Sequence, residues 1–397
     1  MTVEEAGEIV VVGAGLAGVR TVEQLCRGGH RGPITMLGAE PHPPYDRPPL
    51  SKEILRGDRQ PADVVLRDAA FFADNHVDLR TGVRATGLDV EKRLVLVENG
   101  PAVHYDSLVI ATGLQPRQLP GAGDLAGLHV LRTLDHCLRI RESVGAGPAV
   151  VVGAGFIGCE VAASLRGKGV EVTVVDPLPA PLAGALGETI GRLVARLHTE
   201  AGVDLRCGVG VDAILDDGAG RVRGVRLSDG AELAAPVVVS GIGSRPEVEW
   251  LAGTPVEVGN GVLCDAYGRT SIPGVWAVGD VAAWYRPALD KHVRVEHWTS
   301  AGEQALVVAN DMLGTGRPDQ PPVVPYFWSD QFGLKIQALG DIDPADEVRI
   351  LDDDGRRFLA AYVHDGHVAG AVGCGRAGRV MKLRPLIAAR APVSELA

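Results

Sequence analysis

The chain has 397 residues, enough for two or three domains with cores of their own, and 46% of its residues are hydrophobic against 22% charged. Its net charge of −11 argues against nucleic acid and anionic membranes as general partners, and no apolar run reaches the ~18 residues of a membrane span. The opening sequence, MTVEEAGEI, carries acids and leaves no room for a signal peptide, and six scattered cysteines show no metal-like spacing. We therefore expect a cytoplasmic protein with reduced thiols and no bound metal.

The first predicted element is a strand from Ile9 to Val12, followed directly by Gly13, Gly15 and Gly18 and a helix-like stretch. A second strand is expected over residues 34–37. In such a unit the first glycine permits a tight turn, the second allows a pyrophosphate to approach, and the third lets helix and strand pack closely. The unpaired N–H groups of the helix N-terminus would bind the anion.

The segment 38–60 is predicted to be a proline-rich loop that leads into a short helix. Alternating apolar residues over 83–90 and 94–98 indicate antiparallel strands. A buried strand beginning at residue 107 ends in the small residues Ala111, Thr112 and Gly113. After a connector rich in proline and glycine, the chain begins a second unit near residue 148.

This second unit repeats the first, 140 residues later. A strand over 148–152 precedes Gly153, Gly155 and Gly158, and the strand over 237–243 repeats the pattern of 107–113. One glycine motif is weak evidence, but two in one chain indicate two bound dinucleotides. A flavin and a nicotinamide are the favoured pair, so the sequence predicts an electron-transfer enzyme.

The acid that ends the next strand indicates which nicotinamide dinucleotide is used. Asp176 follows the strand over 171–175, twenty-three residues after Gly153, where it can bind both ribose hydroxyls. The residues 177–181 that follow it include no Arg or Lys to receive a 2′-phosphate. The sequence therefore favours NADH over NADPH.

The remaining chain predicts a return to the first domain and then a third domain. A buried strand over 275–278 ends near Asp280, and Trp298 opens a helix-like run over 299–310. After Gly316, short alternating strands are expected over 335–339, 347–351, 358–364 and 368–372, before a final basic, helix-like segment. We expect an α/β protein with a discontinuous FAD-binding domain (1–113 and 246–316), an NAD-binding domain (114–245) and a C-terminal α+β interface domain (317–397).

Seven motifs carry a family resemblance that spans nearly the whole chain. They are PYDRPPLSK at 44–52, ATG at 111–113, RT at 132–133, the second glycine motif with Glu160, AVGD at 277–280, VEHWT at 295–299 and FWSDQ at 327–331. With these motifs the chain resembles the flavoprotein NADH-dependent ferredoxin, rubredoxin and putidaredoxin reductases, which serve bacterial monooxygenases and Rieske dioxygenases. The resemblance implies two Rossmann-like dinucleotide-binding domains of the glutathione-reductase type and a C-terminal α+β domain.

The resemblance also implies the residues that bind the two cofactors, FAD and NADH. By this resemblance, Arg47 would neutralise phosphate and Lys52 would lie beside the flavin ring. Asp280 would accept hydrogen bonds from the ribityl hydroxyls, and the helix that begins at Trp298 would face the flavin N1/C2=O edge. The cofactor-binding residues expected from the motifs and the resemblance are Gly13, Gly15, Ala17, Gly18, Glu40, Arg47, Lys52, Val83, Ala111, Thr112, Gly113, Arg132, Gly153, Gly155, Phe156, Ile157, Gly158, Glu160, Asp176, Gly243, Asp280, Glu296, Trp298 and Trp328.

One position departs from the family pattern. The acid that grips the adenosine ribose usually follows Gly38 directly, but Ala39 occupies that place and Glu40 comes one residue late. Either Glu40 still reaches the ribose, which we favour, or the contact is missing.

The resemblance implies that Lys52 and Glu160 act together in catalysis. Glu160 would orient the nicotinamide amide and pair with Lys52; the alternative is a solvated helix glutamate. The implied reaction is hydride transfer from the nicotinamide C4 to the flavin N5, followed by release of single electrons to an acidic 2Fe-2S ferredoxin. That ferredoxin would serve an oxygenase such as a haem-thiolate or Rieske enzyme.

Two other functions are compatible with the fold. A thiol-dependent oxidase or disulfide reductase would place cysteine soon after the second strand, but none occurs between Glu40 and Leu55. An NADH-binding redox-signalling flavoprotein would act by association rather than turnover. Proteins of that class tend to carry a targeting segment, a basic DNA-binding surface or long C-terminal insertions, and we expect none of the three here.

The C-terminal segment offers a basic surface for an acidic ferredoxin. From Gly366 to Ser394 there is no Asp or Glu, while five basic residues fall in that window: Arg376, Arg379, Lys382, Arg384 and Arg390. A docking surface and an ordinary solvated basic helix are equally compatible with this pattern. If the ferredoxin docks on this segment, reversing the charges of Arg379 and Lys382 is expected to lower ferredoxin-dependent turnover.

Overall fold

The computed structural model describes residues 7–121, 123–315 and 324–396, and it divides the chain into two compact units. Unit 1 comprises 1–46, 64–115 and 244–321, and unit 2 comprises 47–63, 116–243 and 322–397. The expected boundaries 113/114 and 245/246 lie two residues from the division points 115/116 and 243/244, whereas 47–63, expected in the FAD-binding domain, groups with unit 2. The expected boundary 316/317 lies outside the described residues.

Unit 1 is built on a five-stranded parallel sheet of order β20-β7-β1-β2-β3. Two smaller sheets, β4-β5-β6 and β18-β19-β21-β22, complete it. Its helices and strands are β1 (Ile9–Val12), α1 (Leu16–Arg27), β2 (Ile34–Gly38), α3 (Ala69–Asp74), β3 (Val77–Thr81), β4 (Ala85–Asp89), β5 (Leu94–Val97), β6 (Val103–His104), β7 (Ser107–Ile110), β18 (Val258–Gly259), β19 (Gly261–Cys264), β20 (Val275–Ala277), β21 (Ala282–Arg286), β22 (Lys291–Arg294) and α7 (Trp298–Met312).

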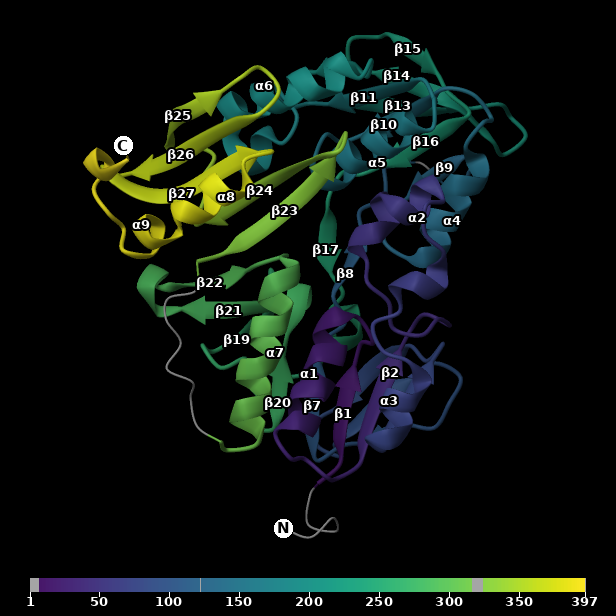
Figure 1. Cartoon of the computed structure of the whole chain (residues 1–397). Helices are drawn as coiled ribbons and strands as arrows, with labels where there is room; N and C mark the ends of the chain where they lie inside the picture. The colour runs from purple at the N-terminus through teal and green to yellow at the C-terminus, as the bar shows by residue number, and fades with distance from the viewer. Residues whose placement is uncertain (1–6, 122, 316–323, 397) are drawn as a thin grey trace. The chain divides into compact units, whose positions relative to one another are not determined.

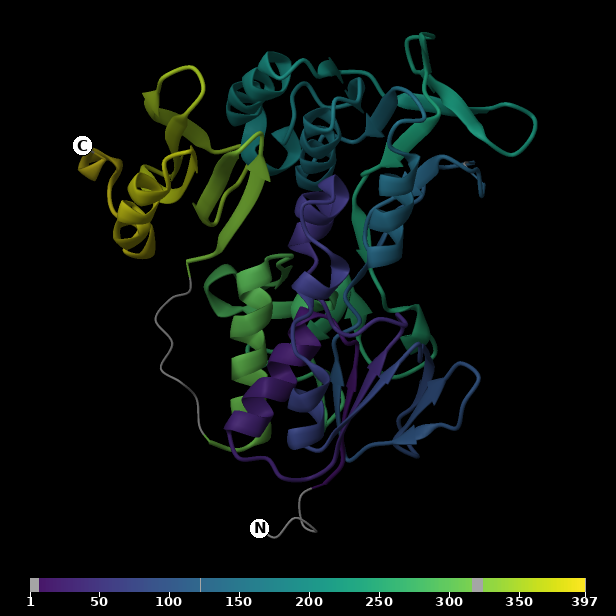
Figure 2. The same ribbon diagram turned by 45° about the vertical axis from the view of Figure 1, so that its right-hand side comes forward.

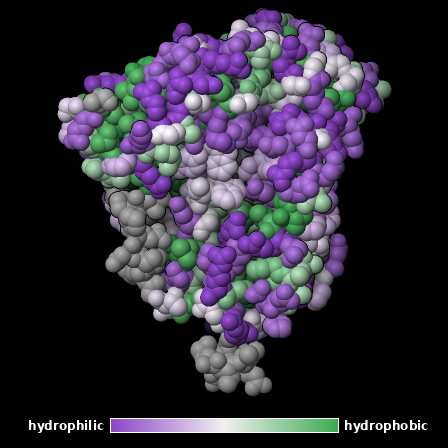
Figure 3. All heavy atoms as spheres, viewed as in Figure 1, coloured by the Kyte–Doolittle hydropathy of each residue, from purple (hydrophilic) through white to green (hydrophobic). Residues whose placement is uncertain are grey.

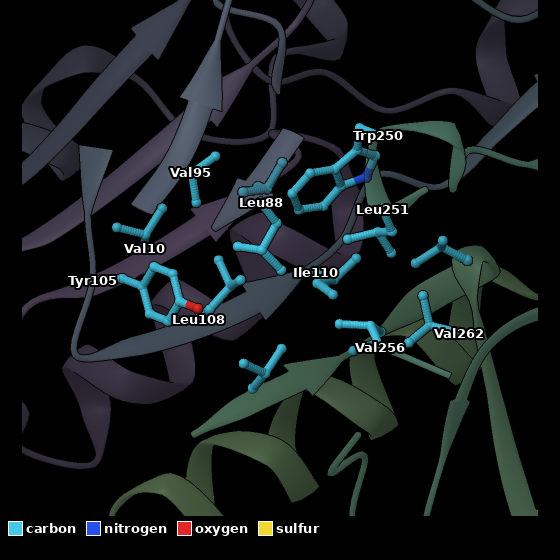
Figure 4. Packing of buried hydrophobic residues seen from close by; sticks show 14 of the residues in the cluster. Val10, Leu88, Val95, Tyr105, Leu108, Ile110, Trp250, Leu251, Val256 and Val262 are labelled. Atoms are coloured by element: carbon cyan, nitrogen blue, oxygen red, sulfur yellow. The ribbon is translucent and has the colours of Figure 1, made fainter. Parts of the chain in front are cut away.

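Both faces of this sheet are buried, as the continuous apolar strands predict. Val10 and Ile110 point to one face, where they pack with Trp250 and Val262 in the cluster that Figure 4 shows. Val11 and its sheet neighbours on the opposite face pack against α1 and α7, which lie side by side in both ribbon views (Figure 1, Figure 2). Because β1 is parallel to its neighbours, the glycine turn that follows it lies at the carboxyl edge of the sheet.

Unit 2 repeats the architecture with the parallel sheet β12-β11-β10-β16-β9, one face of which is covered by the antiparallel sheet β13-β14-β15. The elements of this part are α2 (Glu53–Arg56), β9 (Leu128–Val130), α4 (Leu134–Ser143), β10 (Ala149–Val152), α5 (Phe156–Gly167), β11 (Val172–Asp176), α6 (Ala183–Glu200), β12 (Asp204–Cys207), β13 (Val211–Asp216), β14 (Val222–Leu227), β15 (Glu232–Ala234) and β16 (Val237–Ser240). Short strands β8 (Leu114–Pro116) and β17 (Ser244–Pro246) pair where the chain passes from one unit to the next.

The C-terminal part of unit 2 is an antiparallel sheet of order β23-β24-β27-β26-β25 with two short helices. Its elements are β23 (Tyr326–Gln331), β24 (Leu334–Gly340), β25 (Glu347–Asp353), β26 (Phe358–His364), β27 (His367–Cys374), α8 (Ala377–Lys382) and α9 (Arg384–Ala388). Four strands were expected; β23, which contains FWSDQ, is a fifth. The fold class predicted from the sequence is confirmed.

The face of the molecule in Figure 3 is covered mainly by hydrophilic residues, with smaller apolar patches between them. Within the described ranges, no helix is both long and apolar enough to cross a membrane.

Candidate functional site

The turn between β1 and α1 requires glycine at two of its three motif positions. Gly13 adopts φ +117°, and a Cβ added there would lie 2.1 Å from the carbonyl oxygen of Ala111. A Cβ on Gly18 would lie 2.0 Å from the carbonyl oxygen of Gly13. These two glycines are therefore explained by the backbone packing alone.

Gly15 is different, because nothing in the fold requires glycine there. Its backbone is extended (φ −83°, ψ −171°), a conformation open to any residue, and an added Cβ would meet no described atom within 4 Å. Gly15 is also the N-cap of α1, where the first N–H groups of the helix have no intrahelical acceptor. An open space in front of these donors fits a bound phosphate.

The turn between β10 and α5 repeats each of these features. Gly153 (φ +102°) and Gly158 would place a Cβ 2.4 Å and 1.9 Å from backbone carbonyl oxygens. Gly155 is extended (φ −70°, ψ −177°), and a Cβ on it would again meet no described atom within 4 Å. Each unit thus holds one cradle of the kind that a dinucleotide pyrophosphate occupies.

Glu40 and Val83 lie together at the carboxyl end of β2. The carbonyl of Glu40 accepts a hydrogen bond from Gly82, and the N–H of Val83 donates to Gly38 (both 2.8 Å). The hydroxyl of Tyr45 donates to the Glu40 carboxylate. Glu40 thus follows β2 closely, and its contact with the adenosine ribose remains a prediction.

Three further predicted positions converge on the first cradle. A Cβ on Gly279 would lie 2.6 Å from that of Ala17, which brings the adjoining Asp280 to the first turn of α1. Ala111, as noted, faces Gly13 across the sheet edge. The two residues after Ala111 both bond to Glu247. The hydroxyl of Thr112 donates to the carbonyl of Glu247 (2.7 Å), and the N–H of Glu247 donates to the carbonyl of Gly113.

Trp298 begins α7, as predicted. Its indole N–H donates to the carboxylate of Asp46 (2.8 Å), and the guanidinium of Arg20 lies 5.8 Å from the indole ring. Glu296 is exposed and pairs with Arg294 at 2.5 Å. The flavin contacts expected of Trp298 and Glu296 stay predictions.

Asp176 is buried beside the second cradle. One carboxylate oxygen accepts from the N–H of Ala154 (2.6 Å) and the other from the N–H of Leu178 (2.8 Å). Each oxygen keeps a second lone pair for a ribose hydroxyl. One of the two donors, Ala154, therefore belongs to the loop that would hold the pyrophosphate.

The other predicted positions of unit 2 lie on several elements. Phe156 meets Phe327 edge to face at 5.0 Å, and Ile157 is 46% exposed. Gly243 adopts φ +95° and accepts a hydrogen bond from the N–H of Arg117.

Arg47 and Trp328 are likewise held by neighbours in unit 2. The guanidinium of Arg47 donates to the carbonyl of Arg132 (2.6 Å). Trp328 stacks on Tyr326 with 5.9 Å between the ring centres, and the ammonium of Lys335 lies 5.4 Å from the indole ring. The expected flavin contacts of these residues remain predictions.

Glu160 and Lys52 form a buried ion pair. The Lys52 ammonium lies 2.7 Å from one Glu160 oxygen, and the two residues are 6% and 4% exposed. Ser51 donates to that same oxygen, and Ser329 donates to the other at 2.7 Å. We call these four residues the Glu160 cluster. The alternative that Glu160 is a solvated helix residue is wrong, because the carboxylate is buried against the segment 51–52 and β23.

The chain matches two protein-family models. Residues 7–305 match the pyridine nucleotide-disulphide oxidoreductase model, and residues 326–397 match the reductase C-terminal model. The chain belongs to the pyridine nucleotide-disulphide oxidoreductase family. This confirms the resemblance stated above.

Its relatives include reductase components of oxygenase systems. It is 36% identical over 340 residues to the ferredoxin–NAD(+) reductase component of the p-cumate 2,3-dioxygenase system of Pseudomonas putida, covering 85% of this chain and 82% of the relative. It is 39% identical to rhodocoxin reductase of Rhodococcus erythropolis, covering 84% and 78%. The crystal structure of the covalent putidaredoxin reductase–putidaredoxin complex matches with a TM-score of 0.92 at 31% identity, covering 98% and 94%.

Four residues of the site were not singled out from the sequence. Ser51, Ser329 and Gln331 stand inside the quoted motifs, and His198 lies on α6; all four are buried. The only sequence signal was the spacing of Ser329 and Gln331, which places both on one face of a strand.

The cysteines form no redox centre in the structure. All six are free thiols, and four are buried: Cys137, Cys159, Cys264 and Cys374. Burial raises the pKa of Cys159, and it raises the pKa of Cys137 to about 11 and that of Cys264 to about 12. Such thiols stay protonated and are poor nucleophiles. No group of three or more His, Cys, Asp or Glu residues in the described chain is arranged to hold a metal ion.

Proposed function

We propose that the protein is an FAD-containing, NADH-dependent reductase that passes single electrons to a 2Fe-2S ferredoxin serving an oxygenase. The observation that carries this proposal is the pair of open glycines, Gly15 and Gly155, each at a helix N-terminus where the fold needs no glycine. One dinucleotide bound at each of the two glycines would occupy both open spaces. The relatives named for ferredoxin reduction support the choice of acceptor.

In this proposal the first cradle holds FAD. The N-terminus of α1 binds the pyrophosphate, Glu40 the adenosine ribose and Asp280 the ribityl chain. Bound there, FAD supplies the ability to accept a hydride and return electrons one at a time.

The second cradle holds NADH. The N-terminus of α5 binds the pyrophosphate and Asp176 the adenosine ribose. Glu160, held by Lys52, orients the carboxamide of the nicotinamide. The buried, water-poor surroundings of this pair strengthen its electrostatic effect on the reacting groups.

We expect NADH to exceed NADPH at least tenfold in kcat/KM. A 2′-phosphate would remove a hydrogen bond to the Asp176 carboxylate, worth about 1.5–3 kcal/mol, and would meet its negative charge. Steady-state NAD(P)H–ferricyanide kinetics measure the ratio, and Asp176→Asn should reduce it because the repulsion is lost. Equal use of both coenzymes by the unmodified protein would refute the role of Asp176.

A ferredoxin-dependent cytochrome c reduction assay tests the whole function. A redox-signalling flavoprotein would bind NADH and show little turnover. A disulfide reductase or thiol oxidase would require an accessible thiolate, which the buried cysteines disfavour. We also infer a cytoplasmic location, which cell fractionation tests.

We infer that the acidic ferredoxin docks on the basic C-terminal segment. Arg376 and Arg379 pair with Asp352 (both 2.7 Å), and Arg376 also pairs with Asp354, so much of their charge is neutralised within the domain. The proposed docking surface therefore consists of the three other basic residues of the segment 366–394, all exposed: Lys382, Arg384 and Arg390.

The double change Lys382→Glu with Arg384→Glu should therefore lower ferredoxin-dependent turnover and its salt dependence. NADH–ferricyanide activity should stay at the wild-type level. Arg223→Glu with Arg226→Glu, on β14, is the control for net charge. Unchanged turnover and no salt dependence in the Lys382/Arg384 variant would place docking elsewhere.

A further inference from the structure

A line of hydrogen bonds connects the Glu160 cluster to a histidine that the proposed function does not use. Ser329, which donates to Glu160 at 2.7 Å, lies 3.1 Å from the amide nitrogen of Gln331. The amide oxygen of Gln331 lies 2.9 Å from Nε2 of His198. The line runs within unit 2 from α5 through β23 to α6, and all four residues are buried.

The charge of Glu160 determines the direction of every bond in this line. A carboxylate only accepts, so Ser329 must give its single hydroxyl hydrogen to Glu160. The Ser329 oxygen then accepts from the NH₂ group of Gln331, which turns the Gln331 carbonyl toward His198. Nε2 of His198 must therefore carry a hydrogen, and if the ring is neutral it is the Nε2–H tautomer.

The surroundings of His198 favour this neutral form. The imidazole is fully buried, and the ring of Phe332 meets it edge to face at 4.8 Å. Burial lowers the pKa of His198 to about 4, although the bond to Gln331 opposes the shift. Nδ1 has no hydrogen-bond partner among the described residues, so Gln331 is the group that His198 holds.

We propose that His198 is a positioning residue of the active site, which acts through Gln331 and Ser329 to hold the Glu160 carboxylate in one orientation. The inference rests on the proposed function, in which Glu160 orients the nicotinamide carboxamide. Without the imidazole N–H, the Gln331 amide is free to turn over and present its oxygen to Ser329. The hydroxyl then turns to Gln331, and Glu160 loses a donor.

His198→Phe, which keeps a buried ring but has no N–H group, tests the role. At saturating NADH the flavin should be reduced about three- to tenfold more slowly, the equivalent of one lost hydrogen bond. The Kd of ADP-ribose, which has no carboxamide, should not change. His198→Gln places an N–H near the lost one and should restore most of the rate.

Two further measurements separate positioning from a structural role. In a Glu160→Gln background, His198→Phe should cause no additional loss of rate, because the coupling runs through the carboxylate. Tyr362→Phe is the matched control. It removes another buried hydrogen bond to α6, from the Tyr362 hydroxyl to the Leu186 carbonyl (2.7 Å), and should lower stability but not the rate of reduction.

The tautomer can be checked without turnover. With ¹⁵N-labelled histidine, the NMR signals that disappear in His198→Gln should show Nε2 protonated and Nδ1 unprotonated; the reverse tautomer would overturn the proposal. A wild-type rate of flavin reduction in His198→Phe would also overturn it. The same is true if His198→Phe lowers that rate equally in the unmodified protein and in the Glu160→Gln variant. If His198→Phe does not fold, Gln331→Met interrupts the same line. Failure of NADH to reduce the unmodified protein would refute the proposed function instead, and the NMR result would still decide the tautomer.

Discussion

Replacing Glu160 by Ala is expected to slow reduction of the bound FAD by NADH about 100-fold, the cost of a reacting group misplaced by about 1 Å. It should also lower the free energy of unfolding by about 3–5 kcal/mol, because the Lys52 ammonium, 2.7 Å from the carboxylate, stays buried without its partner. Lys52→Ala should have the same two effects. Stopped-flow absorbance and denaturant unfolding measure them.

A double replacement separates the two effects. Lys52→Met with Glu160→Leu removes both charges, so the loss of stability should be small, yet the rate of reduction should stay low. FAD content should remain close to one per chain in all three variants, since both residues belong to unit 2 and the first cradle belongs to unit 1. A wild-type rate in any of them would show that the pair is only structural. Loss of FAD would instead assign the residue to cofactor binding.

Gly155→Ala is expected to raise the KM for NADH about 100-fold while leaving the melting temperature unchanged. The added methyl group meets no described atom within 4 Å but occupies the space before the N–H groups of α5. Two hydrogen bonds to phosphate, each worth about 1.5–3 kcal/mol, would be weakened. The equivalent change Gly15→Ala should lower the FAD content of the purified protein.

Two neighbouring changes serve as controls. Gly158→Ala places a methyl group 1.9 Å from the Gly153 carbonyl oxygen and should unfold the domain or prevent expression. Gly378→Ala, in an open position on α8, should leave NADH kinetics unchanged. An unaltered KM in Gly155→Ala would contradict the second dinucleotide site.

In each parallel sheet, the strand that carries the glycine motif, β1 or β10, could be predicted because it is a short apolar run that ends in a glycine turn. The edge strands β3 and β12 were not predicted, since each contains charged residues. Strand β23 was not predicted, and the reason is physical. Its buried positions include Ser329 and Gln331, which face Glu160 and His198 rather than an apolar core. A strand whose inner face is polar does not show the usual alternation.

The cradles could likewise be predicted from spacing, because the three glycines and the helix start are local in sequence. The Lys52–Glu160 pair joins residues 108 apart, and only the family resemblance suggested it. His198 and Gln331 are 133 residues apart. A single histidine in an amphipathic helix carries no signal of such a partner, so this part of the site required the structure.

The interleaving of the two units has a consequence for how the chain folds as it is synthesised. The parallel sheet of unit 1 has β20 as its edge strand, paired with β7, so that sheet is incomplete until residue 277 has been made. Unit 2 needs both 47–63 and the segment from 322 onward, near the end of the chain. Long-range pairings of this kind fold slowly and leave sheet edges exposed in the nascent protein. Neither unit is a continuous fragment, so an mRNA truncated before the last third would yield a unit 1 without β20 and a unit 2 without its C-terminal sheet.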